Sequence, residues 1–249
     1  EEDSAGGGLD LDEGGPGDGC DPKKAAERYY WSTRYYATNL RRFLGFATAE
    51  VEKRTRNVLG GACLSPDFVD EGDGLRQDID WFDLYGRRGL NFAETEDWLG
   101  ACRNEALCGY LVDFLRGCCR RQGQPIGVAD VICDGRTPWS VTAKAFAEIG
   151  HGAREIDFYG YGPIYARREL AASDVPGMRA AIRAVTFPVG AVEATLLDGE
   201  KAASSVAQLY SLSSDIRAHA DGKRGRDGAD RSWTNLLLGH LGYDVDVID

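Results

Sequence analysis

The sequence has 249 residues, of which 43% are hydrophobic and 28% charged, a balance that suits one large globular domain or two ordinary ones. Forty acidic residues against 29 basic ones give a net charge of −11, which disfavours binding to nucleic acid and to anionic membrane surfaces. No apolar stretch approaches the roughly 18 to 20 residues that a membrane-spanning helix needs. We therefore expect neither a nucleic-acid partner nor a membrane partner.

The first 22 residues differ from the rest in composition. Residues 1–22 hold eight acidic residues and seven glycines, and almost nothing apolar. We expect this segment to be disordered, because it cannot bury enough surface to offset the entropy of ordering. Residues 23–249 carry 32 acidic and 29 basic residues, so most of the excess negative charge is local.

From residue 23 the pattern changes to that of an amphipathic helix. Apolar residues recur at steps of three and four, which places them on one face of a helix. Aromatic stripes of this kind usually pack into a core, so this face is expected to be buried. Its members are Tyr29, Tyr36, Leu40, Phe43, Leu44 and Ala47.

The chain then alternates between short apolar runs and helical periods up to about residue 199. The expected strands are 57–64, 90–93, 125–132 and 156–159. The expected helices are 80–85, 99–121 and 137–149, followed by a polar helix from about residue 175. This alternation indicates parallel β/α units and an α/β class. About four units fit into residues 23–199, half of the eight that complete a (β/α)8 TIM barrel.

Residues 200–249 look like the start of a second unit. We expect a strand at 206–210, a helix at 233–241 and a strand at 245–248, which together form one β-α-β unit of a doubly wound sheet. Two strands are too few for an independent sheet. Together with the half barrel, this predicts that the sequence is an excerpt of a longer chain.

Seven cysteines, an odd number, are distributed along the sequence. They form no Cys-x-x-Cys pair, and no histidine lies at metal-ligand spacing from them. We predict free, mostly buried thiols, which favour a reducing compartment such as the cytoplasm. The sequence predicts neither a metal nor an organic cofactor.

Two stretches of the chain resemble a known family. In residues 124–165 the strand PIGVADV is followed by GRTP, a helix ending in IGHGA and the aromatic strand DFYGYGP. These segments resemble the seventh and eighth strands of family-42-like β-galactosidases, which are retaining glycoside hydrolases on a β/α barrel. Residues 206–249 resemble the opening of the flavodoxin-like trimerisation domain that follows this barrel. The resemblance implies a carbohydrate substrate with a terminal β-linked sugar, no cofactor, and a homo-oligomer, specifically a trimer.

The resemblance also places the catalytic nucleophile. The family's nucleophilic Glu ends the seventh strand, and Asp130 stands at that position. Asp is one methylene shorter, which retracts the carboxylate by about 1.5 Å. Either the backbone compensates for this difference, or Asp130 has lost the role and instead forms hydrogen bonds with neighbouring loops. The family's acid/base Glu is expected upstream of residue 1.

Further site candidates follow from their positions after strands. Glu94, Glu96, Asp97 and Trp98 come directly after the strand 90–93, which in a barrel is the catalytic face. Carboxylates beside an indole suit a sugar, because its hydroxyls need acceptors and its ring needs a flat apolar surface. Alternatively, these acids cap the next helix, whose first turn favours negative charge.

The fourth strand contributes aromatic candidates. Tyr159 and Tyr161 line the sugar pocket, or else they pack under the loop with Pro163. His151 lies between two glycines at a helix end, where it is expected to act as a C-terminal cap and not as a general base.

Two functions of different classes are compatible with these residues. One is a glycoside hydrolase of β-galactosidase type. The other is a catalytically inactive relative with the same architecture that binds carbohydrate or serves assembly. The departure at Asp130 favours the inactive relative, whereas the acidic and aromatic rim favours the enzyme.

Overall fold

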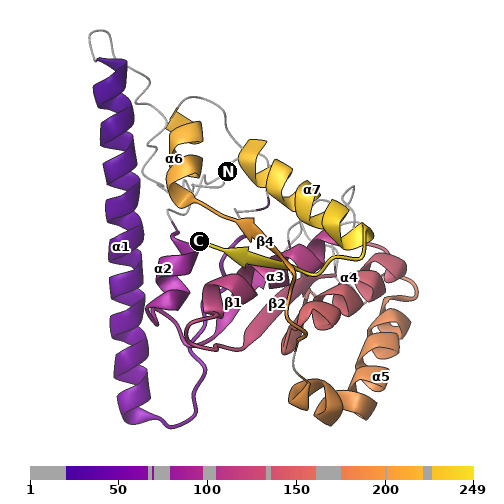
Figure 1. The fold of residues 1–249 in the computed structure, drawn as a ribbon. Coiled ribbons are helices and arrows are strands. Elements are labelled where there is room, and N and C mark those ends of the chain that lie inside the picture. Colours follow the sequence, from indigo (N-terminus) through magenta and orange to yellow (C-terminus); the bar gives the residue numbers. More distant parts are fainter. Residues whose placement is uncertain are drawn as a thin grey trace, which may run out of the picture.

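The computed structural model consists of two parallel β-sheets with helices around them. It describes residues 21–66, 69, 79–97, 105–132, 136–160, 175–199, 201–220 and 226–249. The strands of the larger sheet are β1 (Ala93–Glu96), β2 (Ile126–Val131) and β3 (Glu155–Tyr159), in the order β1-β2-β3. The smaller sheet pairs β4 (Val206–Leu209) with β5 (Val245–Ile248). The predicted α/β class with parallel strands is confirmed (Figure 1).

Seven helices connect and flank these strands in the described residues. They are α1 (Pro22–Arg54), α2 (Trp81–Gly86), α3 (Leu107–Cys119), α4 (Pro138–His151), α5 (Met178–Asp198), α6 (Leu212–Ala220) and α7 (Arg226–His240). The long helix α1 forms one flank of the molecule (Figure 1). The predicted disordered segment 1–22 lies, up to residue 20, outside the described residues.

The main hydrophobic core lies between one face of the larger sheet and helices α2 and α3. Alternate strand residues point to this side, among them Ala93, Ile126 and Val128. They meet the apolar face of α3, where Leu111 and Phe114 are fully buried. A second small cluster of Ile132, Val141 and Met178 joins the strand end to α4 and α5. The opposite face of the sheet therefore does not take part in this helix packing.

Local sequence signals set the bounds of α4. The hydroxyl of Thr137 accepts a hydrogen bond from the backbone N–H of Ser140 at 3.1 Å, and Pro138 occupies the first turn. At the other end Gly152 adopts φ 107°, a left-handed conformation that glycine tolerates best. The prediction of a helix from Thr137-Pro138 to the Gly150-His151-Gly152 segment is confirmed.

Two predicted strands differ from the observed ones. The expected strand at 57–64 is reduced to a single parallel bridge between Leu64 and Thr95. The strand expected at 90–93 is shifted towards the C-terminus and spans Ala93–Glu96. Residues 99–104 of the helix expected at 99–121 lie outside the described residues, and the observed helix α3 spans Leu107–Cys119. Short strands take their bounds from pairing with β2, which an apolar run in the sequence does not specify.

The expected core face of α1 is only partly correct. Tyr29, Leu40 and Leu44 pack against the core, as predicted. Tyr36 and Phe43 are instead exposed, at 49% and 67%. Helix α1 is aromatic on both sides, so the 3.6-residue period does not single out one buried face.

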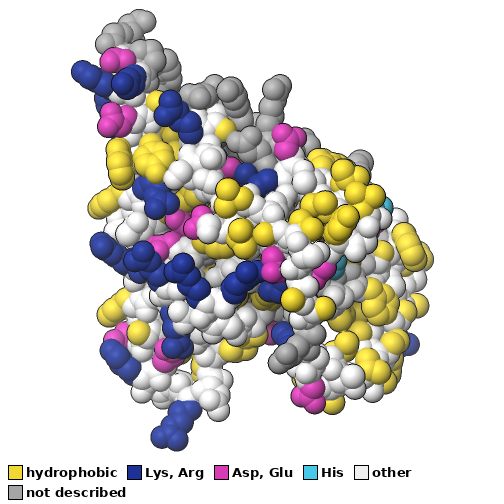
Figure 2. All heavy atoms as spheres, in the orientation of Figure 1, with side chains coloured by type: hydrophobic (Ala, Val, Ile, Leu, Met, Phe, Trp, Pro, Cys, Tyr) yellow, Lys and Arg dark blue, Asp and Glu magenta, His cyan; other side chains and the backbone are white. Residues whose placement is uncertain are grey.

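Helix α5 was expected to be polar, and that expectation was wrong. Its 21 residues are apolar on average, and it is the one helix among the described residues whose length and composition would allow it to cross a membrane. Little of it is buried, and its exposed apolar residues are Phe187, Val192, Leu196 and Leu197. Figure 2 shows hydrophobic side chains gathered on the side of the molecule that carries α5 and α7. The helix itself was expected from about residue 175, but its scattered charges disguise its apolar character in the sequence.

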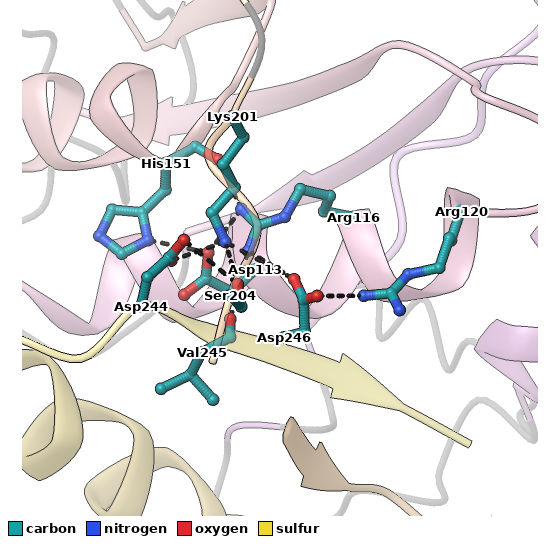
Figure 3. Close-up of polar contacts among 9 residues, drawn as sticks. All are labelled: Asp113, Arg116, Arg120, His151, Lys201, Ser204, Asp244, Val245 and Asp246. Atoms are coloured by element: carbon teal, nitrogen blue, oxygen red, sulfur yellow. Dashed lines mark hydrogen bonds and ion pairs between the residues drawn. The ribbon is translucent and has the colours of Figure 1, made fainter. Parts of the chain in front are cut away.

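The smaller sheet packs against α3 through a close backbone approach. A side chain at Gly117 would collide with the carbonyl oxygen of Val247, so β5 can lie directly on the helix only because residue 117 has no side chain. Ion pairs surround this contact, including Arg120 with Asp246 at 2.7 Å and Lys201 with Asp244 at 2.6 Å (Figure 3). The predicted parallel pair of strands is confirmed, with two helices, α6 and α7, lying between them in sequence instead of one.

His151 belongs to the same polar network. It is the last residue of α4, and its Nδ1 lies 2.9 Å from the buried carboxylate of Asp113. Arg116 donates to the carbonyl oxygen of His151 at 2.8 Å and also pairs with Asp113 at 2.7 Å (Figure 3). His151 was expected to cap α4, but the C-cap is Gly152, and the imidazole instead joins α4 to α3 through Asp113.

Candidate functional site

Acidic side chains lie on both faces of the larger sheet. In the parallel register, Glu94 lies beside Gly127, which lies beside Glu155. One step further along the strands, Glu96, Ala129 and Asp157 form the next row. Side chains alternate along a strand, so the residues between these rows point to the opposite face, towards the helices.

The helix-facing side holds Asp97 and Asp130, both fully buried. Asp97 directly follows β1 and Asp130 lies within β2. Between them lies Lys144 of α4, which forms an ion pair with each carboxylate; its Nζ is 2.5 Å from Asp130 Oδ1. Lys144 also donates to the carbonyl oxygen of Val131 at 3.0 Å. This ammonium group therefore joins the carboxyl ends of two neighbouring strands to the helix that covers them.

Two further charged residues complete the buried cluster. Arg136 lies 3.7 Å from Asp97 Oδ1 and donates to the backbone oxygen of Asp97 at 3.3 Å. Glu148, one turn after Lys144 on α4, is fully buried. Neither carboxyl oxygen of Glu148 has a hydrogen-bond partner among the described residues.

The pKa values of the cluster are shifted chiefly by burial. Burial raises the pKa of Asp130 to about 7, although Lys144 opposes the shift. The pKa of Glu148 is raised well above its ordinary value, first by burial and then by the neighbouring Asp130 and Asp97. Burial alone would lower the pKa of Lys144, but Asp97 and Asp130 outweigh it and raise that pKa, so the ammonium stays charged.

The other face of the sheet carries partly exposed carboxylates. Glu94 and Glu96 are half-buried, and Glu155 and Asp157 are exposed. The pKa of Glu94 is raised first by burial and then by the charges of Glu155, Asp157 and Glu96. We call these four residues the acidic face.

An aromatic residue and a thiol adjoin the acidic face. Tyr159 is the last residue of β3. Its side chain lies on the same face of the sheet as that of Asp157 and is 41% exposed. The thiol of Cys63 donates to Glu96 Oε1 at 3.4 Å. The pKa of this thiol is raised to about 12, first by burial and then by Glu96. A sugar-sized molecule on this face would meet hydrogen-bond acceptors and one aromatic ring.

The residues predicted to form one site are therefore divided between the faces. Glu96 and Tyr159 lie on the acidic face, whereas Asp97 and Asp130 lie in the buried cluster. Trp98 and Tyr161 lie outside the described residues. Glu94 and Glu96 belong to β1, Asp97 directly follows it, and no side chain caps α3 at Ala106. Residues 98–104, where a helix capped by these acids would begin, lie outside the described residues.

Sequence reasoning missed Lys144 and Glu148. Both lie on α4, on the face that also buries Val141 and Ala145. The sequence did contain a signal for them, since they are two charged residues four positions apart within an otherwise apolar helical stripe. A buried charge requires a partner, so this pattern indicates a buried polar cluster.

Comparison with protein-family models and with curated proteins yields no match to this chain. The likeness of its motifs to β-galactosidases accordingly stays an expectation from sequence.

Proposed function

We propose that this chain is part of a glycoside hydrolase of β-galactosidase type that acts on a terminal β-linked sugar by a retaining mechanism. In this proposal the larger sheet belongs to the C-terminal half of a (β/α)8 barrel, and β4 and β5 open a flavodoxin-like trimerisation domain. The observation that carries the proposal is the acidic face, with Tyr159 beside it. In barrel enzymes the active site lies at the carboxyl ends of the strands, and Glu96 and Tyr159 are the last residues of β1 and β3.

The acidic face has the chemistry that a sugar requires. Glu96 and Asp157 offer acceptors for sugar hydroxyls, and the exposed ring of Tyr159 offers an apolar surface. Retaining hydrolysis needs one carboxyl group that attacks the anomeric carbon and another that gives and takes a proton. Glu94, whose pKa is raised, keeps its proton to higher pH than an isolated glutamate, which suits it to proton transfer.

The placement of Asp130 favours a second candidate, the catalytically inactive relative that binds carbohydrate. A nucleophile must reach the sugar, but Asp130 is fully buried on the helix-facing side and paired with Lys144. A carboxylate held in this way anchors α4 to the sheet. The inactive relative keeps the acidic face as a binding surface without using Asp130 in chemistry.

Hydrolysis of a panel of nitrophenyl β- and α-glycosides by the longer protein to which this proposal assigns the chain distinguishes the two candidates. The enzyme hydrolyses one β-glycoside, and Glu96→Gln or Asp157→Asn lowers kcat/KM for it by at least about 100-fold, or ~2.7 kcal/mol of transition-state stabilisation. Asp130→Asn serves as the test of the nucleophile. A loss of several orders of magnitude in a folded Asp130→Asn variant assigns it that role.

A folded protein that is inert on every glycoside but binds a sugar in calorimetric titration is the inactive relative. Binding that Glu96→Gln abolishes would locate the sugar on the acidic face. Absence of both hydrolysis and sugar binding overturns the proposal in either form.

A further inference from the structure

Three side chains with atoms that bind metal ions converge in the buried cluster. They are Asp97, which follows β1, Cys108 on α3, and Glu148 on α4. Their ligand atoms all lie within 4.8 Å of one another, and all three residues are buried. In a tetrahedral site with bonds of about 2.0 to 2.3 Å, ligand atoms lie roughly 3.5 Å apart. Small side-chain rotations would therefore bring these atoms to bonding distance.

The carboxyl group of Glu148 has no polar partner among the described residues, and this points to a bound ligand. Its carboxyl group is fully buried, and neither of its oxygens is hydrogen-bonded by any described residue. Buried carboxyl groups are ordinarily paired, hydrogen-bonded or bound to a metal, because an isolated one costs several kcal/mol. Asp97 has unused capacity too, since its Oδ1 accepts no hydrogen bond from the described residues.

The charges of the cluster point in the same direction. Asp97, Asp130 and Glu148 contribute three carboxyl groups, whereas Lys144 and Arg136 contribute two cations within ion-pair distance of Asp97. Lys144 serves Asp97 and Asp130, and neither cation forms an ion pair with Glu148 in the described residues. Glu148 thus has no ion-pair partner among the described residues, on the side of the cluster where the Cys108 sulfur lies 3.9 Å from Asp97.

We propose that Asp97, Cys108 and Glu148 form a binding site for a divalent transition-metal ion, most suitably Zn²⁺. A thiolate together with two carboxylates matches the ligand preference of zinc and leaves a fourth position open. On binding, the Cys108 thiol releases its proton to solvent as its sulfur bonds the metal, and the Glu148 carboxyl group likewise releases its proton and binds as the carboxylate. This site lies on the face opposite the acidic face, and it does not depend on the proposed glycoside chemistry.

Metal binding is tested on the full chain after removal of metal with a chelator. Titration with Zn²⁺ in a calorimeter is expected to show one ion bound per chain with a Kd of micromolar or below. Titration with Co²⁺ is expected to give a near-ultraviolet thiolate-to-metal charge-transfer band, which reports on the sulfur ligand directly. Both measurements use the unaltered protein, so they do not depend on whether any variant folds.

Variants then assign the ligands. Glu148→Gln, which keeps the shape of the side chain, is expected to weaken Zn²⁺ binding at least tenfold. Cys108→Ser is expected to abolish the Co²⁺ charge-transfer band. Cys63→Ser is the matched control, because Cys63 also contacts a carboxylate but lies outside the cluster, and it should leave both signals unchanged.

Two results overturn the metal site. One is the absence of stoichiometric Zn²⁺ binding by the folded protein. The other is binding that Cys63→Ser removes and that folded Glu148→Gln and Cys108→Ser leave intact. Either result is separable from failure of the proposed function, because glycoside hydrolysis and sugar binding are measured on the acidic face with no added metal.

Discussion

Both faces of the larger sheet carry carboxylates, but those on one face are exposed to water and those on the other are buried. On one face, Glu94, Glu96, Glu155 and Asp157 are half-buried or exposed to water. Burial and the charges of the other three carboxylates raise the pKa of Glu94. On the other face, Asp97 and Asp130 are buried and share one lysine. Glu96 and Asp97 are neighbours in the chain, so a single step along β1 moves a carboxylate from one environment to the other.

The difference teaches which acids are available to a ligand and which hold the fold together. Exposed carboxylates can accept hydrogen bonds from a substrate at little cost, because water already solvates them. Buried carboxylates depend on Lys144, since taking a charge out of water requires a partner. We therefore expect substitutions on the acidic face to affect the proposed sugar binding, and substitutions in the buried cluster to affect stability and the proposed metal binding.

The largest expected effect comes from removing Lys144. In Lys144→Met the two buried carboxylates lose their shared cation, and the free energy of unfolding is expected to fall by about 3 to 5 kcal/mol. Urea unfolding followed by circular dichroism measures the change. Asp157→Asn on the acidic face is the matched substitution and should change stability by no more than about 0.5 kcal/mol. Similar losses in the two variants would contradict the contrast between the faces.

A smaller effect is expected in the dependence of stability on pH. The folded-state pKa of Asp130, about 7, lies above its unfolded value of about 3.8. The stabilisation that the Asp130 proton adds to the free energy of unfolding is therefore fully present below about pH 3.8 and is lost as the pH rises through about 7. The slope that this proton adds is at most about 1.4 kcal/mol per pH unit.

Asp130→Asn isolates that contribution. Unfolding free energies measured between pH 4 and 8 with a chelator present should fall more steeply with rising pH in the unaltered protein than in Asp130→Asn. Parallel curves for the two proteins would show that Asp130 does not hold its proton in the buried cluster.

The smallest expected effect concerns the thiol on the acidic face. Burial and the carboxylate of Glu96 raise the pKa of Cys63 to about 12, so little thiolate is present at pH 8. Glu96→Gln removes the charge, lowers that pKa, and is expected to speed alkylation of Cys63 by iodoacetamide several-fold. Mass spectrometry of the Cys63 peptide measures the rate without interference from other cysteines. An unchanged rate would mean that Glu96 does not act on this thiol.

Helix α4 and the strands around it could be predicted because their signals are local. Thr137, Pro138 and Gly152 act within one turn of the helix ends, and the apolar run of β2 is buried on both faces. Pairing of β4 with β5 followed in the same way, from two short apolar strands separated by helical sequence.

The candidate site could be predicted only in part. Asp97 and Asp130 were recognised as acids near strand ends, and the structure brings them together, but on the helix-facing side. The three-residue shift of β1 relative to the expected strand decided which face each acid of the 94–97 segment takes, because side chains alternate with a period of two. Lys144, which joins the two acids, lies 47 residues from Asp97 and 14 from Asp130, and no local pattern links it to either.

The sequence by itself determined the α/β class, the parallel direction of the strands and the ends of α4, since hydrophobic period, capping residues and glycine conformation act over a few neighbouring positions. Only the tertiary structure decided that Asp97, Cys108 and Glu148 meet, that Lys144 lies between two carboxylates, and that Glu96 and Tyr159 share the opposite face. Their positions depend on strand register and on how α3 and α4 pack over the sheet. Those features arise from contacts between residues far apart in the chain, which composition and periodicity do not encode.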